Sequence, residues 1–357
     1  MKRSKLIFIL LIFPFILSAQ AYPGCVFLMI YPGSRQVGMG GAFSAIADDA
    51  LATYYNPAGL VFQKGIDFSW HYTPWPPGLY PGMHYLYIAS SLPLRSDIAL
   101  ALFLDYLNTG KVVVINSRGE YLGEYTPYDY ALGFSFAYRL IKNLGFGLNL
   151  KYIYSFLFPE WAWRAMPELG ITEGGRARTF AFDFGTLFSQ DFKVSKIGIA
   201  LALQNLGPGV SYTKSEESDP LPYSIRAGFS YTVPYLSILR DLFHWELEEN
   251  WLTEWLFEKS YILCAYDLRE DLYFEDKPWH SIGIEFSLGP ISWQMGRFFD
   301  RNGWREGSTW GMSLDIKFLR LQYGTGKNIY SFPTDNRRFT LSFNFGKPIL
   351  PTGYILK

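Results

Sequence analysis

The sequence is poor in three features that mark common protein classes. Its 357 residues carry no net charge, because 32 Lys and Arg balance 32 Asp and Glu, and this excludes the basic excess typical of nucleic-acid-binding proteins. Two cysteines are too few for a disulfide framework or a Cys-rich zinc module. Beyond the first 20 residues, no apolar run reaches the roughly 18 residues that a membrane-spanning helix requires.

Aromatic residues are abundant instead. The chain has 30 Phe, 26 Tyr and 11 Trp, and aromatic side chains make up 19% of it. This composition excludes intrinsic disorder, which goes with few aromatics and high net charge. Because the chain has many aromatic side chains and no spanning helix, these side chains must be buried or face lipid in another type of fold. The order of the residues along the chain indicates which fold.

The first residues have the layout of a secretory signal peptide. A positively charged start precedes an apolar run over residues 6–17, and small residues follow the run. This order predicts a signal peptide over residues 1–21, removed on export. An N-terminal membrane anchor is the alternative, but the run is too short for one. In an exported protein Cys25 and Cys264 could pair or could remain separate thiols.

Large apolar residues recur at every second position of the remaining chain. Between Tyr130 and Tyr138 the even positions are large and apolar and the odd positions are small, and residues 180–188, 282–288 and 339–345 repeat this pattern. A β-strand places successive side chains on opposite faces. Each stretch therefore predicts a strand with one apolar face and one small or polar face.

The strands of a soluble β-sandwich would show the same alternation. The length of the stretches and the composition of their second face therefore decide between a sandwich and a transmembrane barrel. The stretches run to about 9–12 residues, and their second face is mostly Gly, Ala and Ser rather than charged. That length fits a tilted membrane strand, which favours a transmembrane barrel. Interfacial aromatic girdles are then predicted at the strand ends, at Trp70, Tyr72, Tyr85, Tyr138, Tyr152, Tyr154, Tyr231 and Trp279.

The number of stretches and the lengths of their connections agree with a barrel. About 14 stretches can be counted, and single-chain outer-membrane barrels have an even number. Long connections alternate with tight turns, as extracellular loops alternate with periplasmic turns. The sequence thus predicts an all-β fold, a transmembrane antiparallel β-barrel over residues 65–345. The predicted strands are residues 65–73, 82–92, 97–107, 129–140, 144–155, 180–190, 196–205, 222–233, 259–268, 279–288, 290–298, 308–316, 318–325 and 337–345.

One periplasmic connection, residues 234–258, has helical periodicity. Apolar residues such as Tyr235, Leu239 and Leu242 recur at helical spacing, with charged residues toward the other side. This predicts an amphipathic helix with three alternative roles. It caps the barrel rim, lies on the inner face of the membrane, or docks a periplasmic partner.

The segment before the first strand, residues 33–60, reads GSRQVGMGGAFSAIADDALATYYNPAGL. Its glycines could be mistaken for a phosphate loop, but no strand precedes them and no βαβ unit follows. The adjacent Asp48 and Asp49 are better suited to capping a short helix or turn than to sharing a catalytic centre. Asn56-Pro57 predicts a turn that fixes the direction of the chain.

This segment resembles the N-terminal region of the FadL-type and PorV/PorQ-type outer-membrane proteins, which share a GMGGAF…A.DDA…YYNPAGL pattern. Residues 203–209, 219–222 and 226–229, and the end of the chain from residue 279, look like the PorV/PorQ side. The resemblance implies a fourteen-stranded barrel with a lumenal plug, or hatch, over residues 22–64, and leaves 346–357 as a tail. It assigns to the plug motif Gly38, Gly40, Gly41, Asp48, Asp49, Asn56, Pro57 and Ala58.

Residues for catalysis or metal binding are scarce. The four histidines show no metal-ligand spacing, and neither HExxH nor G-x-S-x-G occurs. Charged residues predicted to face the lumen could form a catalytic cluster, but buried charges must pair. We expect them to pair with one another and with Arg35, Asp48 and Asp49, and we expect no enzyme activity, cofactor or metal site. These lumen charges are Lys151, Asp183, Glu285, Asp315 and Arg320.

The sequence therefore predicts a non-enzymatic barrel in the outer membrane of a diderm (Gram-negative type) bacterium. The resemblance implies a PorV/PorQ-type role in transport or protein secretion, or alternatively a FadL-like channel for long-chain fatty acids or other hydrophobic compounds. A purely structural barrel is a third hypothesis. The expected partners are outer-membrane lipid, together with secreted or periplasmic proteins or a hydrophobic small molecule, and no nucleic acid. An apolar lumen beside the plug would favour the channel.

Overall fold

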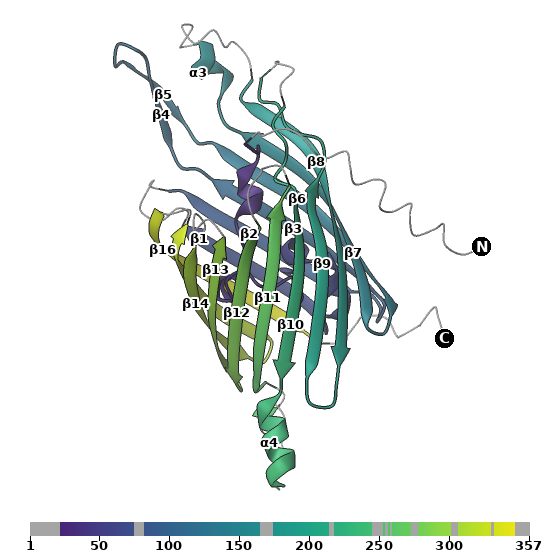
Figure 1. Ribbon diagram of the computed structural model, residues 1–357. Helices are drawn as coiled ribbons and strands as arrows, with labels where there is room; N and C mark the ends of the chain where they lie inside the picture. Colours follow the sequence, from purple (N-terminus) through teal and green to yellow (C-terminus); the bar gives the residue numbers. More distant parts are fainter. Residues whose placement is uncertain are drawn as a thin grey trace, which may run out of the picture.

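The computed structural model describes residues 22–74, 82–164, 174–213, 218–244, 253, 256–257, 259–272, 278–300, 306–329 and 332–346. Fourteen antiparallel strands close into one barrel (Figure 1), which confirms the predicted fold class and strand number. The strands are β1 (Ile66–Pro74), β2 (His84–Pro93), β3 (Ile98–Asn108), β6 (Tyr128–Ile141), β7 (Leu144–Phe156), β8 (Arg176–Asp191), β9 (Lys196–Leu206), β10 (Ser224–Val233), β11 (Tyr261–Asp271), β12 (Trp279–Leu288), β13 (Ile291–Asp300), β14 (Gly307–Ile316), β15 (Leu319–Ile329) and β16 (Phe332–Phe345).

Each barrel strand pairs with its neighbours in sequence, and β1 pairs with β16 to close the ring. The exception is β3, which pairs with β6 because β4 (Val112–Ile115) and β5 (Tyr121–Tyr125) form a separate hairpin. This hairpin lies in a connection where no strands were predicted, and it projects beyond one end of the barrel (Figure 1). Among the described residues, no helix is both long enough and apolar enough to cross a membrane.

The two ends of the barrel differ in their connections. Tight turns, such as the one at Gly289-Pro290 between β12 and β13, gather at the end where β1 begins and β16 finishes, and we call this the turn end. The opposite loop end carries the β4–β5 hairpin and the short helix α3 (Glu160–Arg164). Helix α4 (Tyr235–Phe243) extends away from the turn end (Figure 1). Most of the remaining predicted helix, to residue 258, lies outside the described residues, as do residues 1–21 and the tail beyond Gly346.

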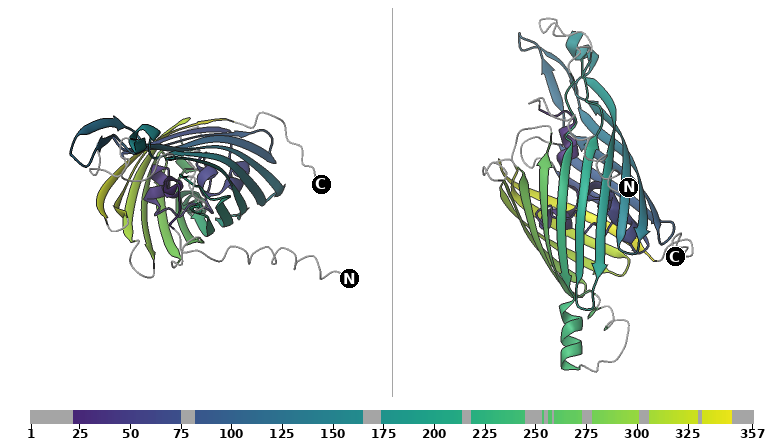
Figure 2. Two further views of the ribbon diagram at one scale, coloured as in Figure 1. Left: turned by 90° about the horizontal axis from the view of Figure 1, so that it is seen from above. Right: turned by 45° about the vertical axis from the view of Figure 1, so that its right-hand side comes forward.

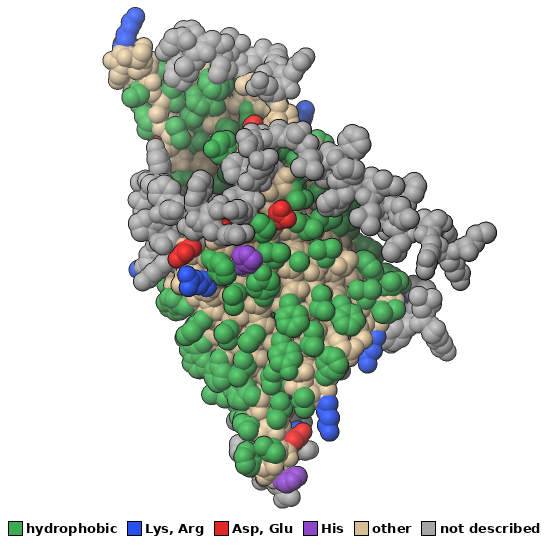
Figure 3. All heavy atoms as spheres, viewed as in Figure 1, with side chains coloured by type: hydrophobic (Ala, Val, Ile, Leu, Met, Phe, Trp, Pro, Cys, Tyr) green, Lys and Arg blue, Asp and Glu red, His purple; other side chains and the backbone are tan. Residues whose placement is uncertain are grey.

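The outer face of the barrel is apolar, and the inner face is small or polar. On β6, Leu132 is 51% exposed and Phe134 43% exposed, whereas Ser135 between Phe134 and Phe136 is buried. Apolar side chains cover much of the visible barrel wall (Figure 3). Continuous apolar surface of this kind marks contact with a membrane or partner rather than with water, and it matches the lipid-facing band of a transmembrane barrel.

Two of the predicted girdle aromatics are wrongly placed. Tyr85 is 0% exposed and Trp279 is 8% exposed, because both occupy inward positions of their strands. An aromatic residue near a strand end belongs to a girdle only if its side chain also points to the outer face of the barrel. Both rings instead pack inside the barrel against the N-terminal segment.

The N-terminal segment, which we define as residues 22–64, lies within the ring of strands (Figure 2). It contains four short helices: η2 (Val26–Met29), α1 (Ser34–Gly38), α2 (Ala52–Tyr55) and η3 (Pro57–Phe62). Helix α1 packs on β13 to β16, and η3 packs on β3 and β6 to β8. The segment therefore crosses the lumen from one side of the wall to the other.

Glycines on the inner face allow this close packing. A Cβ atom added at Gly147 would clash with Pro57 and Ala58, and one added at Gly185 would clash with Asn56. Gly in a strand interior marks a site where another backbone approaches closely. The same approach occurs at Gly198, Gly228, Gly283, Gly296 and Gly324, and we call these seven positions the glycine track.

Candidate functional site

Asn56 joins the N-terminal segment to itself and to the barrel wall. Its Nδ2 donates to the carbonyl oxygens of Ser44 and Thr186, each at 3.0 Å. Its Oδ1 accepts from the backbone N–H of Ala58 at 3.1 Å and so caps η3, which begins at Pro57. An amide can do this because it carries two donors and an acceptor.

The motif glycines contact β14 and the start of the segment. Thr309 Oγ1 donates to the carbonyl of Gly38 at 3.0 Å and accepts from the N–H of Gly40 at 3.1 Å. Gly41 has φ +83°, and a Cβ there would lie 2.5 Å from the ring of Tyr31. Glycine at Gly41 is therefore required both by the left-handed conformation and by the neighbouring ring.

A buried ion pair connects the segment to β12. Arg35 Nε donates to Glu285 Oε2 at 2.8 Å, and Arg35 Nη1 donates to Asp48 Oδ1 at 2.6 Å. Arg35 and Glu285 are almost fully buried, whereas the side chain of Asp48 is 46% exposed. Tyr261 also donates to Glu285, at 3.1 Å, so this buried carboxylate has partners on both oxygens.

Asp49 is buried, unlike Asp48. Its carboxylate accepts from Gln36 Nε2 at 2.6 Å and from the N–H of Leu51 at 3.0 Å. Burial and then the neighbouring carboxylates of Asp48 and Asp67 raise the pKa of Asp49 to about 7. This side chain therefore changes its charge near neutral pH, inside the contact between segment and wall.

The other lumen charges pair within the wall. Lys151 Nζ lies 2.8 Å from Asp183, which also accepts from Asn149 at 2.7 Å. Asn149 donates in turn to the carbonyl of Thr53 in the segment, at 2.6 Å. At the turn end Asp315 accepts from Arg320 at 2.9 Å and from Lys259 at 3.0 Å. Of the five lumen charges, Glu285 is thus the one paired directly with a charge of the segment, Arg35.

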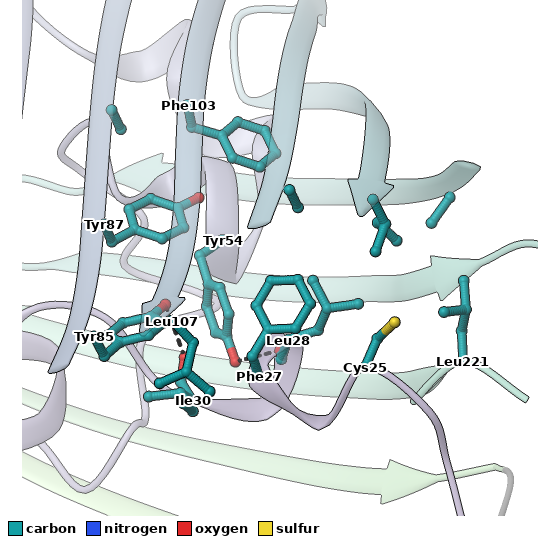
Figure 4. Close-up of a cluster of buried hydrophobic side chains, with 14 of the residues drawn as sticks. Cys25, Phe27, Leu28, Ile30, Tyr54, Tyr85, Tyr87, Phe103, Leu107 and Leu221 are labelled. Atoms are coloured by element: carbon teal, nitrogen blue, oxygen red, sulfur yellow. Dashed lines mark hydrogen bonds between the residues drawn. The ribbon is translucent and has the colours of Figure 1, made fainter. Parts of the chain in front are cut away.

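The half of the lumen nearer the loop end contains a large group of buried apolar and aromatic side chains, which we call the aromatic cluster. Phe27, Leu28 and Ile30 of the segment pack there against rings from β2 and β3 (Figure 4). Tyr85 donates to the carbonyl of Ile30 at 3.2 Å, and the rings of Tyr87 and Phe103 stack with centroids 5.8 Å apart. The members from the wall are Tyr85, Tyr87, Ala89, Phe103, Leu107, Ala131, Ile153, Ala177 and Ala181, and the β9–β10 connection adds Val210 and Leu221.

This cluster was not predicted from the sequence, although a signal for it exists. Tyr85 and Tyr87 alternate with Leu86 and Ile88, so β2 is apolar on both faces. Apolar side chains on both faces of a barrel strand indicate that the lumen beside the strand is apolar, because one face contacts lipid and the other contacts the lumen.

Other chemistry is sparse in the described part of the chain. No group of three or more His, Cys, Asp or Glu side chains there is arranged to hold a metal ion. Cys25 is buried and Cys264 is exposed, and both are free thiols. The alternative in which they pair is therefore wrong for this structure, because Cys25 points into the lumen and Cys264 has the outward parity of β11.

Solved structures share this fold. The toluene transporter TodX of P. putida aligns over 92% of this chain and 100% of its own with a TM-score of 0.53. The toluene transporter TbuX of Ralstonia pickettii aligns over 88% and 98% with a TM-score of 0.52. The monoaromatic hydrocarbon channel CymD aligns over 91% and 99% with a TM-score of 0.51. Sequence identity is 12% in each case, so the likeness is one of fold.

No protein-family model and no curated protein matches the sequence. The three structural relatives are transporters and a channel for aromatic hydrocarbons. At 12% identity their likeness to this chain is confined to the barrel fold. None of them supports the PorV/PorQ-type half of the resemblance.

Proposed function

We propose that this protein is an outer-membrane channel that admits hydrophobic small molecules, with its turn end in the periplasm. The observation that carries the proposal is the aromatic cluster, which is the largest group of buried apolar side chains inside the described part of the barrel. Ligand sites for hydrophobic compounds are concave and apolar, with few polar groups. The shared fold with TodX, TbuX and CymD supports the same assignment.

In this proposal the N-terminal segment is the plug, and its residues 27–30 occupy the place of the substrate. Phe27 and Leu28 are almost fully buried among the apolar residues of the cluster. Their contacts are largely apolar and carry little directional preference, so the carbon atoms of a substrate can replace them at a similar free energy. The rest of the plug remains attached through Arg35, Asn56 and the glycine track.

The experiment is uptake of radiolabelled toluene by cells that express the protein and by cells that do not. Phe27→Ala should raise the uptake rate, because it vacates part of the aromatic cluster. Phe134→Ala is the matched control, since it removes the same ring from the lipid-facing side of β6. The heat-dependent mobility of the purified barrel monitors folding of both variants. Uptake that does not depend on the protein would overturn the proposal.

Protein secretion of the PorV/PorQ type is a second candidate. The resemblance of residues 203–209, 219–222 and 226–229 to the PorV/PorQ type favours it, and α4 extends from the turn end, where a periplasmic partner would dock. Leu242 on this helix is 67% exposed. Co-purification from gently solubilised membranes decides: a defined protein partner that is lost with Leu242→Glu supports secretion, and a barrel always isolated alone contradicts it.

A further inference from the structure

Three arginines of the barrel wall contact one residue of the plug, Tyr31, two of them at its ring and one at its backbone. The guanidinium of Arg226 on β10 lies 4.6 Å from the ring centroid, and that of Arg269 on β11 lies 5.7 Å from it. Arg269 Nη1 donates to the Tyr31 hydroxyl at 3.2 Å. Arg338 on β16 donates to the backbone carbonyl of Tyr31.

Two of these arginines, Arg226 and Arg269, lie close enough to repel each other unless a negative group compensates their charges. Arg226 and Arg269 stand directly opposite each other on neighbouring strands, on the same lumen face, and like charges in that position repel. Asp271 accepts from Arg269 at 2.8 Å, which offsets one of the two charges. The other, on Arg226, interacts through space with the carboxylate of Asp267 and with the rings of Tyr54 and Tyr55.

One nitrogen of the Arg226 guanidinium nevertheless has no hydrogen-bond acceptor in the part of the chain that the structure describes. Arg226 is 1% exposed, and its Nε donates to Gln204 at 2.8 Å. Its Nη2 has no hydrogen-bond partner among the described residues. The nearby Asp267 instead accepts from the backbone N–H groups of Phe43 and Ser44. A buried guanidinium nitrogen without an acceptor is costly, and a carboxylate is the acceptor that fits it best.

Aromatic side chains complete the surroundings of Tyr31. Trp279 stacks on its ring with centroids 5.8 Å apart, and Tyr54 and Tyr55 approach at 6.0 and 5.9 Å. These partners are buried, whereas Tyr31 itself is only partly buried. The ring therefore fills a site with aromatic walls and a cationic end, and the site opens where Tyr31 meets solvent.

We propose that Tyr31 occupies a binding site for a small aromatic molecule that carries an acidic oxygen, of which benzoate is the simplest example. The ring of such a ligand takes the place of the Tyr31 ring, and its carboxylate accepts from Arg226 and Arg269. This inference rests on the proposed function, because the ligand reaches the site through the same lumen. It adds aromatic acids to the hydrophobic compounds that the channel is proposed to admit.

The first test uses the purified full-length protein with Tyr31→Gly, which leaves a space the size of the ring. Benzoate should bind this variant and raise its thermal unfolding midpoint, since a ligand that binds only the folded state stabilises it. Toluene, the same ring without the carboxylate, should raise the midpoint less. Adding Arg226→Gln should weaken benzoate binding roughly tenfold or more and leave toluene binding unchanged, because a charge-assisted hydrogen bond is lost. Arg297→Gln, on the outer face of β13, is the matched control.

Equal stabilisation by benzoate and toluene, or equal weakening of both by Arg226→Gln, would show that Tyr31 only packs against the wall. If Tyr31→Gly does not fold, uptake by cells expressing the unmodified protein decides. Benzoate uptake that falls with Arg226→Gln while toluene uptake persists supports the inference. Toluene uptake without benzoate uptake overturns the inference and leaves the proposed function standing, whereas uptake of neither overturns the proposed function.

Discussion

The two halves of the lumen hold the same N-terminal segment by different physical means. In the half near the loop end, residues 27–30 are held by apolar contacts with the aromatic cluster. In the half near the turn end, the segment is held by smaller apolar clusters and, in addition, by the Arg35–Glu285 ion pair and the amide of Asn56. Apolar contacts can be exchanged for those of another molecule, whereas a buried charge that loses its partner is left at a high cost. This difference supports the proposal that residues 27–30 can be displaced while Arg35 and Asn56 hold the rest of the segment to the wall.

The largest expected effect comes from breaking the contact of the turn-end half at Glu285. Glu285→Ala leaves Arg35 buried with only the half-exposed Asp48 as partner, and removing one member of a buried pair costs roughly 3–5 kcal/mol. Limited proteolysis should then cleave the N-terminal segment in the folded barrel. The double variant Arg35→Met with Glu285→Leu should restore most of the protection, because no charge is left unpaired; cleavage that persists in it would show that the ion pair is not the anchor.

A smaller loss is expected for Asn56→Ala. The substitution leaves the carbonyls of Ser44 and Thr186 without this donor and removes the cap of η3, a cost of about 2–3 kcal/mol. The thermal midpoint should fall while the barrel still assembles. Asn143→Ala, in the β6–β7 turn and bonded there to Gln190, is the comparison. A midpoint as high as that of Asn143→Ala would contradict the role of Asn56.

The next effect depends on pH and concerns Asp49. Its pKa in the folded protein is about 7, above the value of about 3.9 in an unfolded chain, so the folded state binds the extra proton between these values. The stabilisation is complete below about pH 4 and is lost as the pH rises through 7. We expect a loss of roughly 1–2 kcal/mol across this window, less than the shift alone implies because Asp48 beside it reaches solvent. Asp49→Asn should remove the dependence, measured as protease protection at pH 5 and pH 8.

No measurable effect is expected for an ion pair outside the lumen. Lys111 lies 2.6 Å from Glu124 on the projecting hairpin, with side chains 67% and 44% exposed. Exposed pairs contribute little because water solvates both charges. Lys111→Gln should leave the thermal midpoint unchanged. A clear shift of the thermal midpoint would mean that burial does not explain why the ion pairs of the lumen contribute more to stability than this exposed pair.

The barrel could be predicted from the sequence because its signal is local. On β6, Leu132, Phe134 and Phe136 alternate with small residues, and this period of two needs no knowledge of neighbouring strands. The predicted strand was too short where this alternation is missing. β8 begins at Arg176, four residues before the predicted start, because its first residues, which include Arg176 and Arg178, pair with β7.

The lumen was harder to predict because its contacts depend on register. Arg226 and Arg269 are 43 residues apart in sequence and become neighbours only through the pairing of β10 with β11. Tyr85 and Trp279 were assigned to the girdle by position alone, and their parity placed them inside. The pairing of Arg35 with Glu285 likewise joins residues 250 positions apart. Local patterns cannot identify such partners, since a shift of one residue exchanges the two faces of a strand.

The glycine track restricts how the segment can move. Each glycine accommodates a different residue, Gly147 below Pro57 and Ala58 and Gly324 below Ser34, for example. If the segment slid along the wall by one residue, its residues would no longer lie opposite these glycines. They would then clash with the side chains of the neighbouring wall residues. The glycine track therefore opposes a sliding movement of the whole segment through the barrel and favours an opening in which only part of the segment leaves the wall.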